Sequence, residues 1–321
     1  MALDASILTG KHSMTLQQLR YLIAIAQSGS ISSAAHELYI SQSSLSMAVK
    51  DIERECGVTI FERSSKGITL TREGNELLGY ARQVVEQADL MEARYSKQAK
   101  PVAQHLSIAS QHYAFPVEAF LEFVKDYEGE GYSFCLRETR TADVIEDVKD
   151  FRSDIGILYM STFNEQVIGK VLEDANVSFH PLFQARPHVF VGEHHPLAKR
   201  KKLKIEELTS YPRYSFEQGN INSFFYAEEP FAELPHEKKI VISDRGTLSN
   251  LLSHHVGYTV STGVLSSEMH SGIVSIPLET DEKMVVGYII QNERQLSALA
   301  QKYIETLKLF IEDYNKGYAS L

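Results

Sequence analysis

The chain has 321 residues, of which 43% are hydrophobic and 23% charged, and its formal net charge is -10. A chain of this length exceeds one typical hydrophobic core, so we expect two or three domains. The composition excludes a protein that binds nucleic acid over its whole surface, a disulfide-rich secreted protein, and a protein with a membrane span of about 18 uninterrupted apolar residues.

The first segment, residues 1–13, is expected to be a disordered N-terminal extension, because Met14 directly precedes the first helical pattern. It lacks the basic stretch and long apolar run of a secretory signal. The two cysteines, Cys56 and Cys135, form no recognisable framework and suit a reducing compartment. We therefore expect a cytoplasmic protein.

A compact helical domain is predicted over residues 14–71. Thr15-Leu16-Gln17-Gln18 is a capping box that starts a first helix, and Gly29 ends it. Ser30 can cap a second, shorter helix that reaches Leu38. The apolar residues of both helices recur at helical spacing, which predicts a shared core.

The third helix begins at Ser41 and stops at Gly57. Only residues 39–41 separate it from the second helix, and a helix-turn-helix requires such a tight connection. One flank of this helix is small and polar, so its hydroxyls and Gln42 can reach base edges in a DNA major groove. The residues expected to contact DNA here are Ser41, Gln42, Ser43, Ser44, Ser46, Met47 and Lys50.

Two short β-prone runs, residues 58–61 and 67–70, follow and predict a hairpin, or wing. Arg63 and Lys66 on this wing are further candidate DNA contacts. The alternative is a small packing module without DNA, because residues 14–71 contain five basic and five acidic residues and carry no net charge. The pattern alone favours DNA binding.

The run from Leu16 to Leu78, with LRYLIAIAQSGSISSAAHELYISQSSLSMAVKDIE and IFERSSKGITLTREG, resembles the N-terminal domain of LysR-type transcriptional regulators. The resemblance implies a winged helix-turn-helix that binds double-stranded promoter DNA, with RNA polymerase as a further candidate partner. Met47 departs from the family pattern, which commonly has arginine or another polar residue there. Methionine offers only apolar contact, for example to a thymine methyl group.

A long helix over residues 72–101 is predicted to begin after Thr71 and to end at Pro101. Its apolar residues recur at spacings of four and three, as in the a/d seam of a coiled coil. This predicts dimerisation, and the alternative is a helix that packs on its own chain. The resemblance implies a linker helix, with a homodimer that further contacts extend to a homotetramer. The predicted seam residues are Leu77, Ala81, Val84, Ala88, Met91 and Tyr95.

Strands alternate with helices over residues 102–321, which predicts βαβ units and a mainly parallel sheet. The predicted elements are 105–110, 116–127, 132–138, 142–151 and 154–159, then 188–192, 205–208, 239–243, 247–254 and 257–261, and finally 273–278, 284–290 and 295–315. The resemblance implies a two-lobed α/β, Rossmann-like effector domain similar to periplasmic solute-binding proteins. We expect one lobe from residues 102–174 and 274–321 and the other from residues 175–273, with crossovers near 174–180 and 268–274.

Ligands of open α/β sheets bind beyond the carboxyl ends of the strands, where helices begin. Hydroxyls and helix N-termini at these positions suit a small anion, and Arg140 can add a bidentate contact to a carboxylate. The alternative for each hydroxyl is a simple helix cap. The predicted effector-binding residues are Ser110, Gln111, His112, Thr139, Arg140, Thr141, Arg245, Thr247, Ser261 and Thr262.

No catalytic residue, cofactor or metal site is predicted. The chain has no G-x-G-x-x-G, G-x-x-x-x-G-K-[ST], G-x-S-x-G or H-E-x-x-H motif. The histidine pairs at 194–195 and 254–255 have no cysteine or carboxylate at a spacing that completes a metal site. The leading hypothesis is a DNA-binding regulator controlled by a small, anionic effector. The alternatives are an enzyme on an α/β scaffold and a solute-binding protein without a DNA function.

Overall fold

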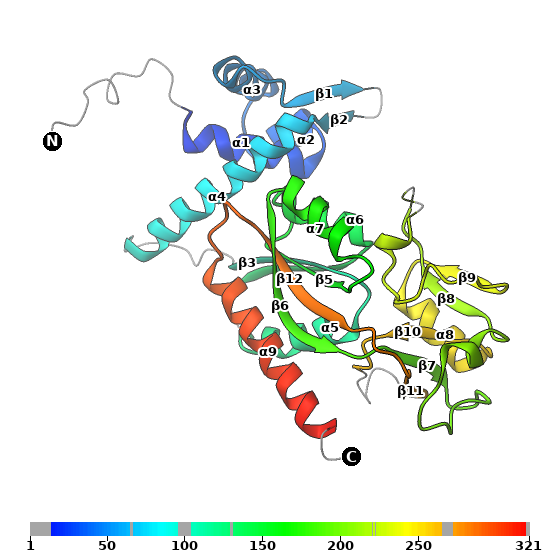
Figure 1. The fold of residues 1–321 in the computed structure, drawn as a ribbon. Helices are drawn as coiled ribbons and strands as arrows, with labels where there is room; N and C mark the ends of the chain where they lie inside the picture. Colours follow the sequence, from blue (N-terminus) through cyan, green and yellow to red (C-terminus); the bar gives the residue numbers. More distant parts are fainter. Residues whose placement is uncertain are drawn as a thin grey trace. The chain divides into compact units, whose positions relative to one another are not determined.

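The computed structural model describes residues 14–64, 67–95, 104–128, 131–219, 221, 223–264 and 272–318, and the structural statements below concern these residues (Figure 1). The chain divides into two compact units, Met1–Val102 and Ala103–Leu321. We describe each unit by itself. The predicted extension at 1–13 lies outside the described residues.

The first unit opens with three short helices, α1 (Leu16–Ser28), α2 (Ile31–Glu37) and α3 (Gln42–Cys56). The predicted signals are confirmed. Thr15 forms a capping box with Gln18, and Ser41 caps α3. Gly29 and Gly57 end α1 and α3 in the left-handed region, at φ 64° and 70°. The helices share one core, whose fully buried members are Leu22, Ile25, Ala34, Leu45, Ile52 and Ile60.

The predicted wing is present as the antiparallel hairpin of β1 (Phe61–Ser64) and β2 (Gly67–Leu70). It is tied to α3 because Glu53 Oε1 accepts a hydrogen bond from Ile60 N at 2.8 Å. The next helix, α4 (Arg72–Tyr95), begins where Thr71 Oγ1 accepts a hydrogen bond from Gly74 N at 2.8 Å. A Cβ at Gly74 would lie 2.1 Å from the Ile60 carbonyl oxygen, so this close approach requires glycine.

The first lobe of the second unit is built on a five-stranded sheet with the order β4 (Tyr132–Glu138), β3 (Gln104–Ser110), β5 (Ile155–Met160), β12 (Met284–Gln291) and β6 (Val177–Ala185). β3 is parallel to β4 and β5, whereas β12 is antiparallel to β5 and β6. Helices α5 (Ala114–Lys125) and α9 (Ala298–Tyr318) cover one face, and α6 (Thr141–Lys149) and α7 (Glu165–Asp174) cover the other (Figure 1). Successive residues of β3 supply both faces, because strand side chains alternate.

The second lobe contains two small sheets. β7 (His188–Gly192) pairs antiparallel with β10 (Thr259–Ser261) and β11 (Ile273–Pro277), and β8 (Arg213–Phe216) pairs parallel with β9 (Lys239–Ile242). A bridge between Arg213 and Tyr258 joins the two sheets. Helix α8 (Arg245–His254) packs on β7 through Leu252 and Phe190, and two 3-10 turns, Ile205–Leu208 and Phe224–Tyr226, lie between the strands.

Two predictions for this unit, both of lobe boundaries, need correction. β6 belongs to the five-stranded sheet, so the first lobe continues to residue 185 instead of ending at 174. β11 pairs with β7, so the second lobe extends beyond residue 273. The predicted mainly parallel sheet is present in the first lobe. Only β12 runs against the other four strands, since β6 is antiparallel to β12 and therefore has the direction of β3, β4 and β5.

Candidate functional site

The predicted DNA-facing flank of α3 lies on the surface of the first unit. Gln42, Ser43, Ser44 and Lys50 are exposed, and 64% of Met47 is exposed. Ser46 is half-buried. The opposite side of the helix is buried through Leu45, Val49 and Ile52. The helix thus has one side in the core of the unit and one side exposed.

Three hydroxyls are grouped at the start of α3. Ser41 Oγ accepts a hydrogen bond from Ser44 N at 3.1 Å and lies 2.9 Å from Ser43 Oγ and 2.7 Å from Ser44 Oγ. Ser41 therefore caps the helix and orders its neighbours. In the part of the chain that the structure describes, the Gln42 amide has no hydrogen-bond partner, which leaves it available to a base edge.

The wing residues predicted to contact DNA cannot be placed. Lys66 and the side chain of Arg63 lie outside the described residues, so their roles stay predictions. Sequence reasoning missed Tyr39 in the turn between α2 and α3. This residue has φ 54° and is 93% exposed, so its hydroxyl can donate a hydrogen bond to a phosphate. Its aromatic character in a three-residue turn was the available signal.

The predicted seam of α4 faces two directions. Ala81 is buried against Leu19 of α1, and Leu77 packs on the core of the helical domain. An ion pair between Arg20 and Asp89 also joins α1 to α4. Val84 and Met91 are 49% and 60% exposed, Ala88 is half-buried, and the Tyr95 side chain lies outside the described residues. Among the described side chains of α4, the large apolar ones that are exposed are Tyr80, Val84 and Met91.

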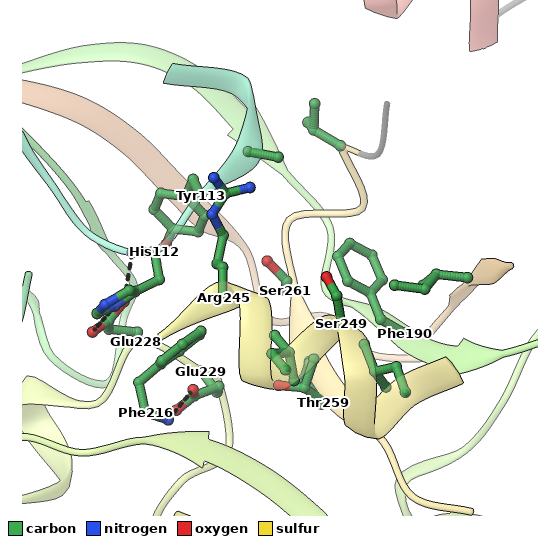
Figure 2. Close-up of a pocket in the computed structure, with 16 residues that line it drawn as sticks. His112, Tyr113, Phe190, Phe216, Glu228, Glu229, Arg245, Ser249, Thr259 and Ser261 are labelled. Carbon is green, nitrogen blue, oxygen red and sulfur yellow. Dashed lines mark hydrogen bonds and ion pairs between the residues drawn. The ribbon is translucent and has the colours of Figure 1, made fainter. Parts of the chain in front are cut away.

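A small cavity of about 40 Å³ lies between the two lobes of the second unit (Figure 2). His112, Tyr113 and Ala114 line it from the first lobe, where β3 ends and α5 begins. The other lining residues come from the second lobe, and its polar members there are Glu228, Glu229, Arg245, Ser249, Thr259 and Ser261. The cavity therefore lies at the carboxyl ends of the parallel strands, as the rule for open sheets predicts.

One side of the cavity carries an ion pair across the lobes. His112 Nδ1 lies 2.9 Å from Glu228 Oε2, and the backbone N–H of His112 donates to the same oxygen at 2.8 Å. Gln218 Nε2 donates to Glu228 Oε1 at 3.0 Å. Burial lowers the pKa of His112, but the contacts with Glu228 outweigh it and raise the pKa above its ordinary value. His112 is therefore held towards its charged form by Glu228.

The neighbouring Glu229 has a different environment. Its Oε1 accepts a hydrogen bond from Phe216 N at 2.8 Å, whereas its Oε2 is buried without a partner among the described residues. Glu229 is 3% exposed. Burial, and secondly the charge of Glu228, raise its pKa to about 7 despite the opposing effect of Arg213. The cavity wall thus contains an acceptor oxygen that no described group of the protein satisfies.

The opposite side of the cavity is formed by α8 and β10. Arg245 binds Glu138 of the first lobe through Nε and Nη2. Ser249 and Ser261 lie beside Arg245 in Figure 2, and their hydroxyls form no hydrogen bond within the described ranges. The Tyr113 hydroxyl is likewise buried and unpartnered there, and its pKa is raised far above the usual range, chiefly by burial. Tyr113 therefore remains a neutral phenol.

Of the predicted effector-binding residues, His112, Arg245 and Ser261 line the cavity. Gln111 and Thr141 are buried and hydrogen-bonded to each other, and Thr141 also donates to the Tyr226 carbonyl. Arg140 pairs with Glu217 outside the cavity. The remaining four also lie outside the lining and hydrogen-bond to nearby backbone or side chains, namely Ser110, Thr139, Thr247 and Thr262.

Sequence reasoning missed Tyr113, Phe216, Glu228, Glu229 and Ser249. The adjacent acids Glu228 and Glu229 stand between aromatic residues and Pro230, and an acidic pair in such an apolar stretch was the available signal. Within the described ranges, no group of three histidine, cysteine or acidic residues is arranged to hold a metal ion. None of the helices in those ranges has the length and apolar character needed to cross a membrane.

Two family models match the chain. The model described as "Bacterial regulatory helix-turn-helix protein, lysR family" matches residues 16–75, which cover α1 to the start of α4. The model described as "LysR substrate binding domain" matches residues 130–310, which cover most of the two-lobed unit and the second-lobe side of the cavity.

Individual proteins agree with this assignment. The chain is 28% identical over 268 residues to the HTH-type transcriptional regulator CysB of Haemophilus influenzae, covering 81% of this chain and 78% of that protein. It is 27% identical over 305 residues to the transcriptional dual regulator GltC of Bacillus subtilis, covering 91% and 96%. A solved full-length OxyR variant from Pseudomonas aeruginosa has the same fold, with a TM-score of 0.64, 22% identity and coverage of 94% and 95%.

Proposed function

The chain belongs to the LysR family of DNA-binding transcriptional regulators, which are not enzymes, and from this premise we propose that a small effector bound in the inter-lobe cavity controls how it engages promoter DNA. The observation that carries the proposal is the composition of the cavity wall. Both lobes contribute to it, and buried polar groups on it have no partner among the described residues.

The DNA-reading part of the proposal concerns α3. Its exposed flank, with Gln42, Ser43, Ser44 and Lys50, has polar side chains that can reach base edges in a major groove. The N-terminus of α3, where Ser41 groups the hydroxyls, favours a nearby phosphate. Arg63 and Lys66 on the wing would add contacts to the DNA backbone. Because promoter DNA is the proposed partner, we propose that the protein acts in the cytoplasm.

We propose a homodimer that uses the exposed apolar residues of α4, Tyr80, Val84 and Met91. A second copy would cover this stripe, which otherwise faces water. Two readers in one dimer address half-sites about 34–36 Å apart, or a multiple of that distance. A tetramer and a contact with RNA polymerase are further parts of the proposal that come from the family.

An anionic group on the effector suits the cavity on two grounds. Tyr113 precedes α5 without a side-chain cap within the described ranges, so the N–H groups of Ala114 and Phe115 at the start of this helix can bind an anion. Ser249 and Ser261 line the same cavity as Arg245, and their hydroxyls have no hydrogen-bond partner within the described ranges. An acid on the ligand would thus meet donors on both lobes.

Control of DNA binding requires the effector to prefer one arrangement of the lobes. Three cross-lobe contacts make the arrangement sensitive to what enters the cavity, namely His112 with Glu228, Arg245 with Glu138, and Arg140 with Glu217. The first two border the cavity. An effector that inserts between the lobes competes with these contacts and changes their geometry.

The test uses the full chain and a duplex that it binds. Fluorescence anisotropy of the labelled duplex is recorded with and without each member of a panel of amino acids and organic acids. We expect at least one compound to change the affinity or salt dependence, and the variant Ser261→Val to weaken the response to that compound. A compound that acts equally on the wild type and on cavity variants would contradict the proposed site.

A further inference from the structure

We propose that the effector carries a protonated amine that binds the free carboxylate oxygen of Glu229, so that the ligand class is a small amino acid-like zwitterion. The inference rests on the proposed function, because it assumes that the inter-lobe cavity holds the effector. It goes further by assigning Glu229 as the group that selects the class of ligand.

The two adjacent acids of the cavity wall, Glu228 and Glu229, differ in how many hydrogen bonds their carboxylates accept. Glu228 accepts hydrogen bonds from the His112 backbone, the His112 ring and the Gln218 amide. Glu229 accepts one from Phe216 N and keeps Oε2 unpartnered among the described residues, although the residue is 3% exposed. Buried polar atoms in proteins are nearly always hydrogen-bonded, so an orphaned oxygen on a residue that lines a cavity points to a donor from outside the chain.

The charges around the cavity leave Glu229 without a direct counterion in the described part of the chain. Arg245 is paired with Glu138, and His112 is paired with Glu228. Arg213 is the nearby cation, but its guanidinium donates to the carbonyls of Phe231 and Pro230 and contacts His236 instead of Glu229. A cationic donor on the ligand would supply the missing charge.

An amine fits this position better than a second acid or an apolar group. An ammonium donates three hydrogen bonds, and a charge-assisted bond to a carboxylate is about twice as strong as a neutral one. The raised pKa of Glu229, about 7, reflects burial and the neighbouring Glu228. A bound cation would favour the ionised form, whereas an anion at the same place would be repelled. The neutral Tyr113 hydroxyl can accept a further N–H from the ligand.

The rest of the wall suits the acid end of such a ligand. Ser249, Ser261 and Arg245 lie together on α8 and β10, and Glu229 enters from the segment between β8 and β9 (Figure 2). The cavity therefore has donors for a carboxylate and an acceptor for an amine at different places. A ligand with both groups would satisfy both without leaving a buried charge unpaired.

The cavity volume limits how the ligand enters. The cavity volume of about 40 Å³ exceeds the roughly 10–15 Å³ that one water molecule requires but is well below the roughly 150 Å³ of a protein cavity that binds benzene. An ammonium group fits this space, but a whole amino acid requires the lobes to separate slightly. The cross-lobe pairs of His112 with Glu228 and Arg245 with Glu138 must then adjust, which connects recognition of the amine to the arrangement of the lobes.

The experiment is isothermal titration calorimetry of the full chain with matched ligand pairs. Each of alanine, valine, methionine, glutamate and phenylalanine is compared with the acid of the same skeleton that lacks the amine, such as propionate for alanine and glutarate for glutamate. We expect at least one amino acid to bind, and its amine-free partner to bind at least about tenfold more weakly, as loss of a charged hydrogen bond predicts.

The test variant is Glu229→Gln, which keeps an oxygen for the Phe216 N–H and removes the charge. It should weaken binding of the amino acid about 10- to 100-fold. Glu237→Gln, the same change at an exposed position of the same lobe, should have no effect. Circular dichroism and retained DNA binding show that each variant is folded, and Glu229→Asp, which keeps the charge but shifts its position, should weaken binding less than Glu229→Gln.

The outcomes separate this inference from the proposed function. Amine-free acids that bind as tightly as the amino acids, with no loss in Glu229→Gln, would overturn the inference. A response to such acids that depends on Ser261 would still support the cavity as the effector site. Failure of every amino acid to bind would overturn the inference, whereas an effector that ignores all cavity variants would contradict the proposed function itself.

Discussion

The imidazole of His112 stacks on the ring of Phe216, with 4.1 Å between the ring centroids and 8° between the planes. His112 follows β3 in the first lobe, and Phe216 ends β8 in the second. The same imidazole contacts Glu228, so two residues of the second lobe hold one side chain of the first. This contact closes one side of the cavity.

Replacing His112 should loosen the lobes. His112→Ala removes the stacked ring and leaves Glu228 buried with fewer partners, so we expect a loss of about 2–4 kcal/mol in the free energy of unfolding. Urea denaturation followed by circular dichroism measures it. His194→Ala, with a side chain that is 84% exposed, is the control and should change little. Equal stability of both variants would show that the His112 contacts do not join the lobes.

Glu229 should make the stability depend on pH. Its pKa is about 7 in the folded chain, whereas the ordinary pKa of a glutamate is 4.5, so the folded state binds more protons between these values. The contribution of Glu229 to the free energy of unfolding is therefore complete below about pH 4.5 and is lost as the pH rises through about 7. Besides burial, the groups that act on its pKa are Glu228, which raises it, and Arg213 and the backbone N–H groups of Phe216 and Glu229, which lower it.

The measurement compares the wild type with Glu229→Gln in urea denaturation at pH values from about 5 to about 8, which span the shifted pKa. The stability of the wild type relative to the variant should fall across this range, because the variant has no carboxyl to ionise. If the free energy of unfolding of the wild type relative to the variant stayed constant or grew with pH, the pKa of Glu229 would not be raised by its surroundings.

Base reading should reside on α3. Gln42→Ala and Ser43→Ala should weaken binding to a specific duplex by about 1–3 kcal/mol each, and they should affect random DNA much less, because hydrogen bonds to base edges distinguish sequences. Fluorescence anisotropy with both duplexes measures the two affinities. The same loss on both duplexes would assign these residues to the DNA backbone instead.

Lys66 on the wing should behave in the opposite way. Lys66→Ala should weaken specific and random binding alike and reduce the slope of log K against log salt by about one, because a phosphate contact releases counterions. The readout is the affinity at several salt concentrations. An unchanged slope would remove Lys66 from the DNA backbone contacts.

The exposed stripe of α4 should hold the dimer. Val84→Glu and Met91→Glu place charges on a surface that a second copy is proposed to cover, so both should shift the chain towards monomer. Sedimentation velocity measures the mass. Glu76→Gln, an exposed position on the same helix, is the control. Dimers that persist in both glutamate variants would place the interface elsewhere.

Local signals made the helical domain predictable. Thr15, Ser30 and Ser41 are helix caps, and Gly29 and Gly57 are helix stops, and all five act as their sequence positions indicate. The direction in which α4 presents its apolar residues was not predictable in the same way. Ala81 was assigned to a dimer seam, but it is buried against α1 of the same chain. The prediction failed because a heptad pattern does not distinguish a partner chain from a neighbouring helix.

The cavity was only partly predictable. Ser261 ends β10 and His112 lies two residues after β3, so the rule for open sheets found them. Glu228 and Glu229 lie in the connection between β8 and β9, and no periodicity places such a segment against the other lobe. Strand β6 was missed because Pro181 interrupts a pattern that otherwise alternates. The antiparallel return through β12 depends on contacts between distant parts of the chain.

The most direct test of the central claim is selection of duplexes from a random library by the full chain, followed by sequencing. The account predicts an enriched, partly palindromic site whose half-sites are about one helical turn, or a multiple of it, apart. The variant Gln42→Ala should select a different or degenerate base at one position of each half-site. A wild-type chain that enriches no sequence, or a site that Gln42→Ala leaves unchanged at every position, would contradict it.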